Sequence, residues 1–302
     1  MNDVVVRELH TIEEFEEVFR LFDAIWRPQP GAAPLTVELM RALSHSGNYV
    51  AGAYRGDRLV GASAGFLAAP PGQAMHSHVT GTTAGQGVGL ALKLHQRSWA
   101  LARGLSTITW TYDPLVRRNA HFNLVKLGAR PEEYLPSFYG PMDDAINAGD
   151  ESDRMLAVWR LSDPAVLDAV RGRPRRVEVP EGAVVGVADA GGGPVTGRTD
   201  AATVLVAVPE DIETLRLKDP AAARAWRLAV REVLGGLLAE GARVTGFHDK
   251  SCYVVERGPS LPEGPEPPAW PVRRGLSHPA SWKTPPGRRG IEGRGGARRT
   301  PP

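Results

Sequence analysis

Three glycines at alternate positions stand directly before an apolar helical stretch, and they constrain the fold more than any other feature of the chain. They are Gly85, Gly87 and Gly89, within residues 83–104. A helix usually begins with Ser, Thr, Asp or Asn, whose side chain caps the free N–H groups. Glycines in that place leave the backbone donors bare at the positive end of the helix dipole, which suits a bound phosphate. The other interpretation is a tight strand-to-helix turn that needs positive φ angles.

The spacing of the glycines argues against two common nucleotide-binding loops. A dinucleotide-binding loop reads G-x-G-x-x-G and follows the first strand of its domain. Here the pattern is G-x-G-x-G, and several predicted strands and helices precede it. A P-loop ends in Gly-Lys-Ser or Gly-Lys-Thr, and neither triplet follows these glycines.

Hydrophobic periodicity predicts the order β-α-α-β-β-β-α-β-α-β for residues 1–161. Strands are expected at 4–9, twice within 49–68 around a turn at 55–57, and at 74–81, 106–113 and 154–161. Helices are expected at 11–26, 35–47, 90–103 and 119–129. Thr11 and Glu14 have the spacing of a capping box at the first helix. The glycine loop therefore lies at a strand-to-helix junction of a mixed sheet.

Residues 162–257 predict a smaller β-α-β-β block. The pattern indicates a short helix after residue 162, a hairpin turning at 191–193, a strand, a helix at 220–241 and two last strands. One side of the long helix carries the apolar residues Trp226, Val230, Val233 and Leu237. The block is short of apolar residues, so we expect it to dock on residues 1–161. The expected fold class is α/β, a mixed sheet with a smaller C-terminal block.

The segment 258–302 is rich in Pro, Gly and Arg and is predicted to be a disordered basic tail. It holds eight basic residues against three acidic ones, whereas the whole chain carries a net charge of only +2. The remaining chain is mildly acidic, so we expect it to bind no nucleic acid. A single cysteine, Cys252, is typical of a reducing cytoplasm. Neither a leader nor a membrane-spanning apolar run is evident, so a cytoplasmic protein without membrane partners is expected.

Several strings of the sequence together resemble one superfamily. The predicted order of elements over residues 1–161 resembles the GNAT superfamily of acyl-CoA-dependent N-acyltransferases. Residues 84–89 resemble its pyrophosphate-binding motif, usually written Arg/Gln-x-x-Gly-x-Gly/Ala, except that Ala84 replaces the Arg or Gln. The string RRNAHFNLVKLGA at 117–129 resembles the helix that follows in this family. Together with HSHVTG, TWTYDPL, YG and SDR, it is similar to a little-studied bacterial branch of predicted acetyltransferases.

The resemblance implies a GNAT-type fold that binds acetyl-CoA or another acyl-CoA as co-substrate. Backbone N–H groups of the glycine loop would close around the pyrophosphate, and the pantetheine arm would pair with the strand at Val79. Asn119 would both cap its helix and hydrogen-bond the CoA arm. The cofactor-binding residues implied in this way are Val79, Gln86, Gly87, Val88, Gly89, Leu90 and Asn119.

Proton transfer points to two histidines and one tyrosine. His76 and His78 share one face of a predicted strand, and histidine titrates near neutral pH, so either is a candidate catalytic base, with His78 favoured. Packing in the core is the alternative for both. The family's usual tyrosine proton donor aligns with Leu124, so Tyr139 is the candidate catalytic replacement, with Tyr134 as a second choice. The two histidines have no third ligand at a suitable spacing, so no metal is expected.

Asp113, Arg117 and Arg154 are the candidate substrate contacts, because an arginine fork suits a substrate carboxylate such as that of an amino acid. The predicted function is an enzyme, an N-acyltransferase that moves an acetyl or larger acyl group from acyl-CoA to the primary amine of a small molecule. A degenerate acyl-CoA-binding protein without transferase activity is the alternative, favoured by Ala84 and Leu124. A homodimer is left open.

Overall fold

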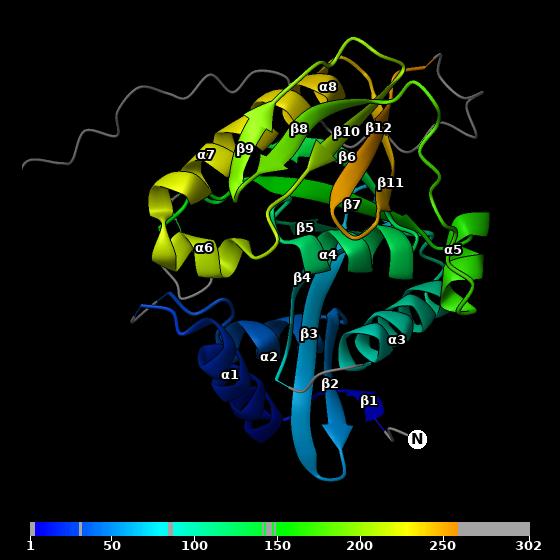
Figure 1. Cartoon of the computed structure of the whole chain (residues 1–302). Coiled ribbons are helices and arrows are strands. Elements are labelled where there is room, and N and C mark those ends of the chain that lie inside the picture. The colour runs from blue at the N-terminus through cyan, green and yellow to red at the C-terminus, as the bar shows by residue number, and fades with distance from the viewer. Residues whose placement is uncertain are drawn as a thin grey trace, which may run out of the picture.

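The computed structural model describes residues 4–29, 32–83, 87–140, 142, 147 and 149–258, which form two β-sheets flanked by helices (Figure 1). The first sheet has seven strands in the order β1-β2-β3-β4-β5-β7-β6. They are β1 (Val4–Glu8), β2 (Tyr49–Arg55), β3 (Arg58–Ala68), β4 (Ala74–Thr82), β5 (Thr107–Tyr112), β6 (Arg130–Leu135) and β7 (Arg154–Arg160). The helices between them are α1 (Ile12–Trp26), α2 (Val37–His45), α3 (Val88–Ala102), α4 (Arg117–His121) and the π-helical turn η1 (Phe122–Lys126). The predicted tail lies, apart from Gly258, outside the described residues.

Helices cover both faces of the first sheet, and the alternation along β3 explains how. Ala62 and Ala64 pack into a core cluster with α1 and α2. Ser63, between them, points the other way and accepts a hydrogen bond from Gln96 of α3. The predicted capping box at the start of α1 is confirmed, because the Thr11 side chain accepts from Glu14 N while Glu14 accepts from Thr11 N. Local sequence and packing agree in this half of the chain.

The strands β4 and β5 separate along their length. They form a parallel pair joined only at Ala74–Thr107, Met75–Ile108 and His76–Thr109. Beyond these positions β4 continues beside β3 and β5 continues beside β7. A β-bulge adds to the divergence, because Gly65 of β3 faces Ser77 and Ala64 faces Val79, which leaves His78 as the extra residue. Toward their carboxyl ends, the inner edges of both strands therefore pair with no other described strand.

Three details differ from the sequence-based expectation. The edge strand β6 was not predicted, because it carries Pro131 and two glutamates instead of an alternating apolar pattern; Pro is tolerated at a sheet edge. The helix expected from residue 119 begins earlier, at Arg117, and passes into η1 after His121. The helix α6 (Ile212–Lys218) was also missed, since polar residues hide its short buried stripe.

The second sheet belongs to the C-terminal part and has five strands in the order β11-β12-β10-β8-β9. They are β8 (Val184–Ala190), β9 (Gly193–Thr196), β10 (Thr203–Ala207), β11 (Arg243–His248) and β12 (Cys252–Glu256). Besides α6, the helices are α5 (Pro164–Val170), α7 (Pro220–Val230), α8 (Gly236–Ala239) and the π-helical turn η2 (Arg231–Gly235). The predicted apolar side of the long helix is buried, including Trp226 and Leu237. The fold class, α/β with a mixed sheet and a smaller C-terminal part, is confirmed.

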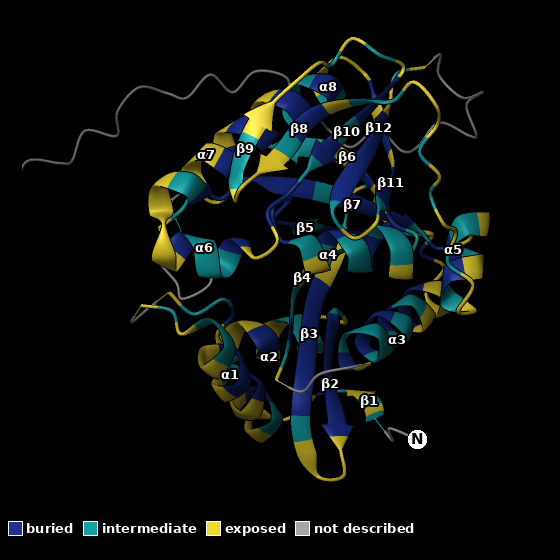
Figure 2. Cartoon of the chain, viewed as in Figure 1, coloured by how far each residue is buried: buried dark blue, intermediate teal, exposed yellow. Residues whose placement is uncertain are grey.

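One hydrophobic core joins the two sheets. Its cluster contains Trp110 and Trp159 of the first sheet together with Val206 and Tyr253 of the second and Trp226 of α7. Figure 2 shows buried residues running through the strands of both sheets. The proposed boundaries at residues 161 and 257 therefore stay predictions, because the core crosses the first of them without a break.

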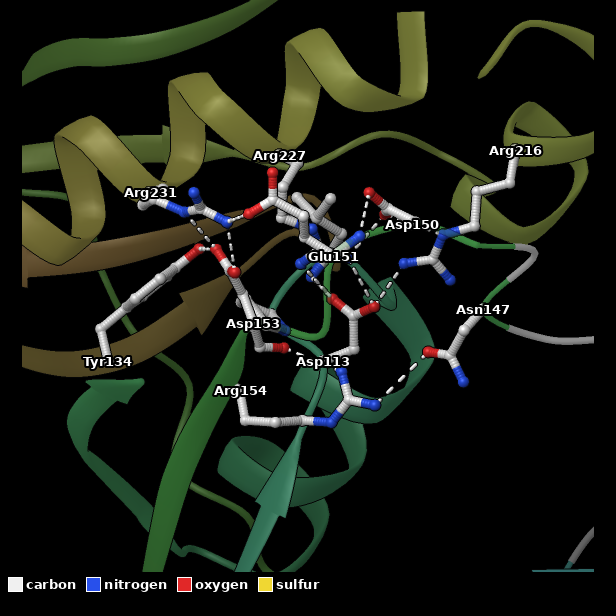
Figure 3. Close-up of polar contacts among 12 residues, drawn as sticks. Asp113, Tyr134, Asn147, Asp150, Glu151, Asp153, Arg154, Arg216, Arg227 and Arg231 are labelled. Carbon is white, nitrogen blue, oxygen red and sulfur yellow. Dashed lines mark hydrogen bonds and ion pairs between the residues drawn. The ribbon is translucent and has the colours of Figure 1, made fainter. Parts of the chain in front are cut away.

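A buried cluster of charges also connects the two parts, and we call it the clamp (Figure 3). Its members are Asp113, Asp150, Asp153, Arg216, Arg227 and Arg231. Arg227 makes a bidentate pair with Asp113, with both N–O distances at 2.9 Å, and also bonds Asp150. Arg231 pairs with Asp153 in the same way. Arginines of α6, α7 and η2 are thus fixed to carboxylates next to β5 and β7.

Candidate active site

A cleft of about 410 Å³ opens where β4 and β5 separate. Its wall comes from both strands and from the first turns of α3 and of the α4–η1 helix. The lining is polar, with hydroxyls from Ser77, Thr80 and Thr111 and an amide from Asn119. A second, wider hollow of about 690 Å³ lies at the β2–β3 turn beside α1, but it is open and lined mostly by charged surface side chains. The cleft is therefore the candidate site.

The N-terminus of α3 lies at the cleft and has no side-chain cap. Gly87 occupies the capping position with a φ of 101°, a left-handed value that favours glycine. A Cβ added at Gly87 would meet no described atom within 4 Å, and one added at Gly89 would only reach the Phe122 ring at 3.9 Å. The space before the helix is thus not filled by described side chains. Val88 is buried, so it offers only its backbone here, and Gln86 lies outside the described residues.

The two histidines of β4 lie on one face, where both rings contact Phe66. The His76 ring nitrogen Nδ1 is 3.0 Å from Thr109 Oγ1. Burial, together with the charges of His78 and Lys93, lowers the pKa of His76 to about 4. Burial also lowers the pKa of His78, partly opposed by a hydrogen bond to the backbone of Pro34. His78 lines the cleft, whereas His76 does not appear in its wall.

Lys93 of α3 is the site residue that sequence reasoning missed. Its side chain lines the cleft and is only 5% exposed. Nζ donates to Ser77 Oγ at 2.9 Å and to Gln96 Oε1 at 3.2 Å, and it lies 3.9 Å from the centre of the Trp110 ring. Burial lowers the pKa of Lys93 to about 7. A signal was present in the sequence, since Lys93 and Gln96 share a helical stripe with the buried Ala100.

Asn119 lines the cleft but does not cap its helix, because α4 begins two residues earlier and Val116 is its N-cap. That corrects the predicted capping role. Its amide makes no hydrogen bond with the other described residues. The neighbouring Asn123 is engaged, since its Oδ1 accepts from Trp110 Nε1 at 3.2 Å. The π-helical turn η1 places Phe122 and Asn123 in the cleft wall, and such turns are frequent at functional sites.

The two candidate tyrosines differ in position. Tyr139 is 43% exposed, and its hydroxyl lies 3.0 Å from the hydroxyl of Thr111 in the cleft wall. The Tyr134 hydroxyl donates to Asp153 of the clamp at 2.7 Å, and burial and that carboxylate raise its pKa well above the usual value. Tyr134 is therefore held by the clamp. Leu124 packs against the core and offers no proton.

The three predicted substrate contacts lie away from the cleft wall. Asp113 is a buried member of the clamp, where burial alone would raise its pKa, but Arg227 and Arg216 outweigh that effect and lower it. Arg117 donates to the backbone carbonyl of Val208 in the C-terminal part. Arg154 is buried and donates to the carbonyl of Asp153 and to side chains of residues 142 and 147. These three are engaged in holding the fold, which sequence spacing does not reveal.

Among the described residues, no group of three or more His, Cys, Asp or Glu side chains is arranged to hold a metal ion. None of the described helices combines the length and apolar character needed to cross a membrane.

Comparisons with known proteins give likenesses only at the level of structure. No family model matches the sequence, and no curated protein does. A GNAT-family acetyltransferase from Streptococcus pneumoniae matches with 16% identity and a TM-score of 0.41, covering 52% of this chain and 98% of its own. The aminoglycoside 6'-N-acetyltransferase from Enterococcus faecium matches with 14% identity and a TM-score of 0.40, covering 53% and 98%. The ribosomal-protein-S18-alanine N-acetyltransferase from Escherichia coli matches with 12% identity and a TM-score of 0.43, covering 53% and 95%.

These three solved structures are acetyltransferases, and the likeness spans about half of this chain and nearly all of theirs. Identities of 16% or less and TM-scores below 0.5 assign no reaction to this chain. Its chemistry has to come from the cleft.

Proposed function

We propose that the cleft binds an acyl-coenzyme A and that the protein transfers the acyl group to the primary amine of a small molecule. The observation that carries this proposal is the separation of the parallel strands β4 and β5 beside the uncapped N-terminus of α3. Coenzyme A supplies an activated thioester when bound, and every other feature of the proposal is a property of the chain itself.

The start of α3 fits a pyrophosphate. Its first N–H groups have no side-chain cap and no acidic residue in the first turn, so the dipole and the donors face space that no described side chain fills. Glycine at positions 87 and 89 keeps that space free, because a longer side chain at either place would extend into it. The backbone of Val88 and Leu90 adds donors to the same turn. Gln86 stays a proposed contact, since it lies outside the described residues.

The separated strands fit an extended arm that carries amide groups. Backbone N–H and C=O groups are obligatory hydrogen-bonding groups, and those on the inner edges of β4 beyond His76 and β5 beyond Thr109 have no strand partner. A ligand with its own amides, such as the pantetheine arm, pairs with such an edge like an added strand. Val79 lies on this edge stretch of β4, and the free amide of Asn119 faces the same cleft.

The charge of the cleft favours an amine that also carries an anionic group. Its described lining contains the cationic side chains of Lys93 and Arg118 and no carboxylate. A polycationic amine would find no carboxylate partner in that described lining, whereas the carboxylate of an amino acid would find an arginine fork at Arg118 and the protonated form of Lys93. His78 is the proposed acceptor of the amine proton. His76 is no longer favoured, because a group with a pKa of about 4 is a weak base at neutral pH.

The test is a calorimetric titration of CoA and acetyl-CoA into the full chain and two variants. Gly89→Glu places a negative charge in front of α3, and we expect it to weaken acetyl-CoA binding at least about tenfold. Gly236→Glu is the matched control, because this glycine lies in a helix too and an added Cβ there would meet no described atom within 4 Å. Equal loss in both variants, or no binding to the wild type, overturns the proposal. Binding without turnover on a panel of amino acids and other primary amines would leave a CoA-binding protein without transferase activity.

A further inference from the structure

Lys93 is a buried cation without a counter-charge. Its ammonium contacts a hydroxyl, an amide oxygen and the face of Trp110, and none of the ion pairs among the described residues includes it. A buried charge usually needs a paired charge, because removal from water strongly disfavours the ionised form. Most charged side chains buried elsewhere in the described structure have such a partner, as in the clamp. The burial of Lys93 beside the cleft therefore calls for a chemical explanation.

Burial is the cause of the lowered Lys93 pKa, and no described acid lines the cleft to oppose it. His76 of β4 lies close enough to interact with the charge of Lys93, whereas Arg118, also in the cleft wall, is paired with Glu213. Ser77 and Gln96 fix the position of Nζ, while the low accessibility disfavours the ammonium. The outcome is a lysine with a pKa of about 7, which exchanges protons readily at neutral pH.

Transfer of an acyl group from a thioester produces a thiolate, and that thiolate needs a proton. Leu124, at the position where the resemblance implies a tyrosine, provides none. A thiol has an ordinary pKa of about 8.5, so an ammonium with a pKa near 7 is the stronger acid by roughly 1.5 units. An ordinary lysine, with a pKa of about 10.4, would hold its proton too tightly to serve. The environment of Lys93 thus creates the acid that this reaction requires.

We propose that Lys93, held by Ser77 and Gln96 against Trp110, is the proton donor to the leaving sulfur of coenzyme A. The inference rests on the proposed acyl transfer. The amine nitrogen bonds to the acyl carbon, the carbon–sulfur bond breaks, and its electron pair goes to sulfur. Nζ gives one proton to the sulfur, His78 takes one from the amine nitrogen, and that proton returns to Nζ through water. Amine and thioester become amide and thiol, and Lys93 is unchanged. Ser77 and Gln96 are positioning residues.

The first test observes Lys93 without any turnover. The chain has five lysines, so ¹³C-labelled lysine side chains can be followed by NMR and Lys93 assigned from the Lys93→Met variant. We expect the Lys93 signal to titrate near pH 7, about three units below the ordinary lysine value of about 10.4. We also expect CoA to shift it more than desulfo-CoA, an analogue without the sulfur. Titration together with the other lysines, or equal shifts from both analogues, overturns the inference. If neither CoA nor desulfo-CoA binds, the proposed function is overturned as well.

The second test separates proton donation from a structural role. With acetyl-CoA and an amine that is turned over, Lys93→Met should lower kcat about 100-fold while the KM for acetyl-CoA changes less than about twofold. The wild-type kcat should fall as the pH rises through about 7, where the ammonium is lost, and the variant should lack that fall. The exposed Lys126 supplies the control, and Lys126→Met should behave as wild type. A variant with unchanged kcat and pH profile contradicts the inference.

A competing pathway uses the same pair of residues. Because Ser77 Oγ lies 2.9 Å from Nζ, a neutral Lys93 has the geometry to activate Ser77 as a nucleophile, with the acyl group held as an ester. Mass spectrometry of the full chain after mixing with acetyl-CoA distinguishes the two. We expect no acetyl group on Ser77. An acetyl adduct that forms on the wild type and is absent from Ser77→Ala would support covalent catalysis and overturn proton donation by Lys93.

Discussion

The cleft and the clamp both bury charged side chains, but they treat charge in opposite ways. In the clamp, each buried arginine meets one or two carboxylates, and Arg227 is 1% exposed with Asp113 and Asp150 against it. In the cleft, Lys93 is 5% exposed and meets only neutral groups. Paired charges hold their ionised forms over a wide pH range, whereas an unpaired one is brought close to neutrality. The first arrangement fixes a structure, and the second prepares a proton exchange.

Removal of one clamp carboxylate should give the largest effect. Asp113→Ala leaves Arg227 and Arg216 buried with a lost partner, so we expect the free energy of unfolding to fall by about 3–5 kcal/mol. Because the pKa of Asp113 is lowered by folding, its contribution is present above the unfolded pKa of about 3.9 and is lost as the pH falls below it. Urea unfolding at neutral and acid pH measures both. Asp200→Ala, which breaks an exposed pair with Arg198, is the control and should leave stability unchanged. Similar stability for the two variants would contradict a stabilising role of the clamp.

Replacement of the cleft lysine should act in the opposite direction. Lys93→Met removes a buried charge without a partner among the described residues, so we expect the free energy of unfolding at pH 7 to rise by about 2–4 kcal/mol. This gain is smaller than the free energy that corresponds to the lowered pKa of Lys93, because the variant also loses the hydrogen bonds of Nζ. The folded pKa of about 7 lies below the unfolded pKa, so the unfolded chain binds more protons between these values. Wild-type stability relative to the variant should therefore increase from pH 7 to about 10. Thermal unfolding between pH 7 and about 10 measures how the stability difference changes with pH. A variant less stable than the wild type would contradict the view that Lys93 is a buried charge without compensation.

An exposed ion pair at the edge of the cleft should matter little for folding. Arg118 bonds both carboxylate oxygens of Glu213, but its side chain is 65% exposed. We expect Arg118→Ala to lower stability by less than about 1 kcal/mol, since solvent screens such pairs. Urea unfolding of Arg118→Ala and Asp113→Ala under the same conditions compares the two losses of stability. If Arg118→Ala lost as much stability as Asp113→Ala, the exposed pair would contribute as much as the buried clamp, contrary to our expectation.

The smallest effect is expected at the tyrosine that the sequence favoured for catalysis. If Lys93 donates the proton, Tyr139→Phe removes only a hydrogen bond to Thr111, and kcat should fall less than about threefold. Steady-state rates for the Phe variant and Lys93→Met under the same conditions make the comparison. A larger fall for Tyr139→Phe would transfer the donor role from the lysine to the tyrosine.

Local patterns predicted most of the fold. The capping box at Thr11 and the glycine at position 87 act through the backbone within a few residues, so their effects can be read from short segments. The strand β6 was not predicted, because an edge strand needs no alternating apolar pattern and tolerates Pro131. The helix α6 was not predicted, because only two of its seven residues, Ile212 and Arg216, are buried, and these two form no recognisable apolar stripe.

The site was less predictable, for a physical reason. A lysine in a helix is usually solvated, and only the strand arrangement shows that Lys93 lies under the gap between β4 and β5. Asp113 looked like a substrate contact because its partners, Arg216 and Arg227, lie about a hundred residues away in sequence. Pairing across such a distance depends on the fold as a whole, which no short motif encodes.

The separation of Asp113 from its arginines also bears on how the chain is made. During synthesis the first sheet leaves the ribosome before Arg216 and Arg227 exist, so the carboxylate beside β5 has no partner for that interval. Burial of an unpaired carboxylate is costly, and completion of the shared core must wait for α6 and α7. Closure of the shared core around Asp113 should therefore follow the synthesis of α6 and α7, after the whole first sheet has left the ribosome.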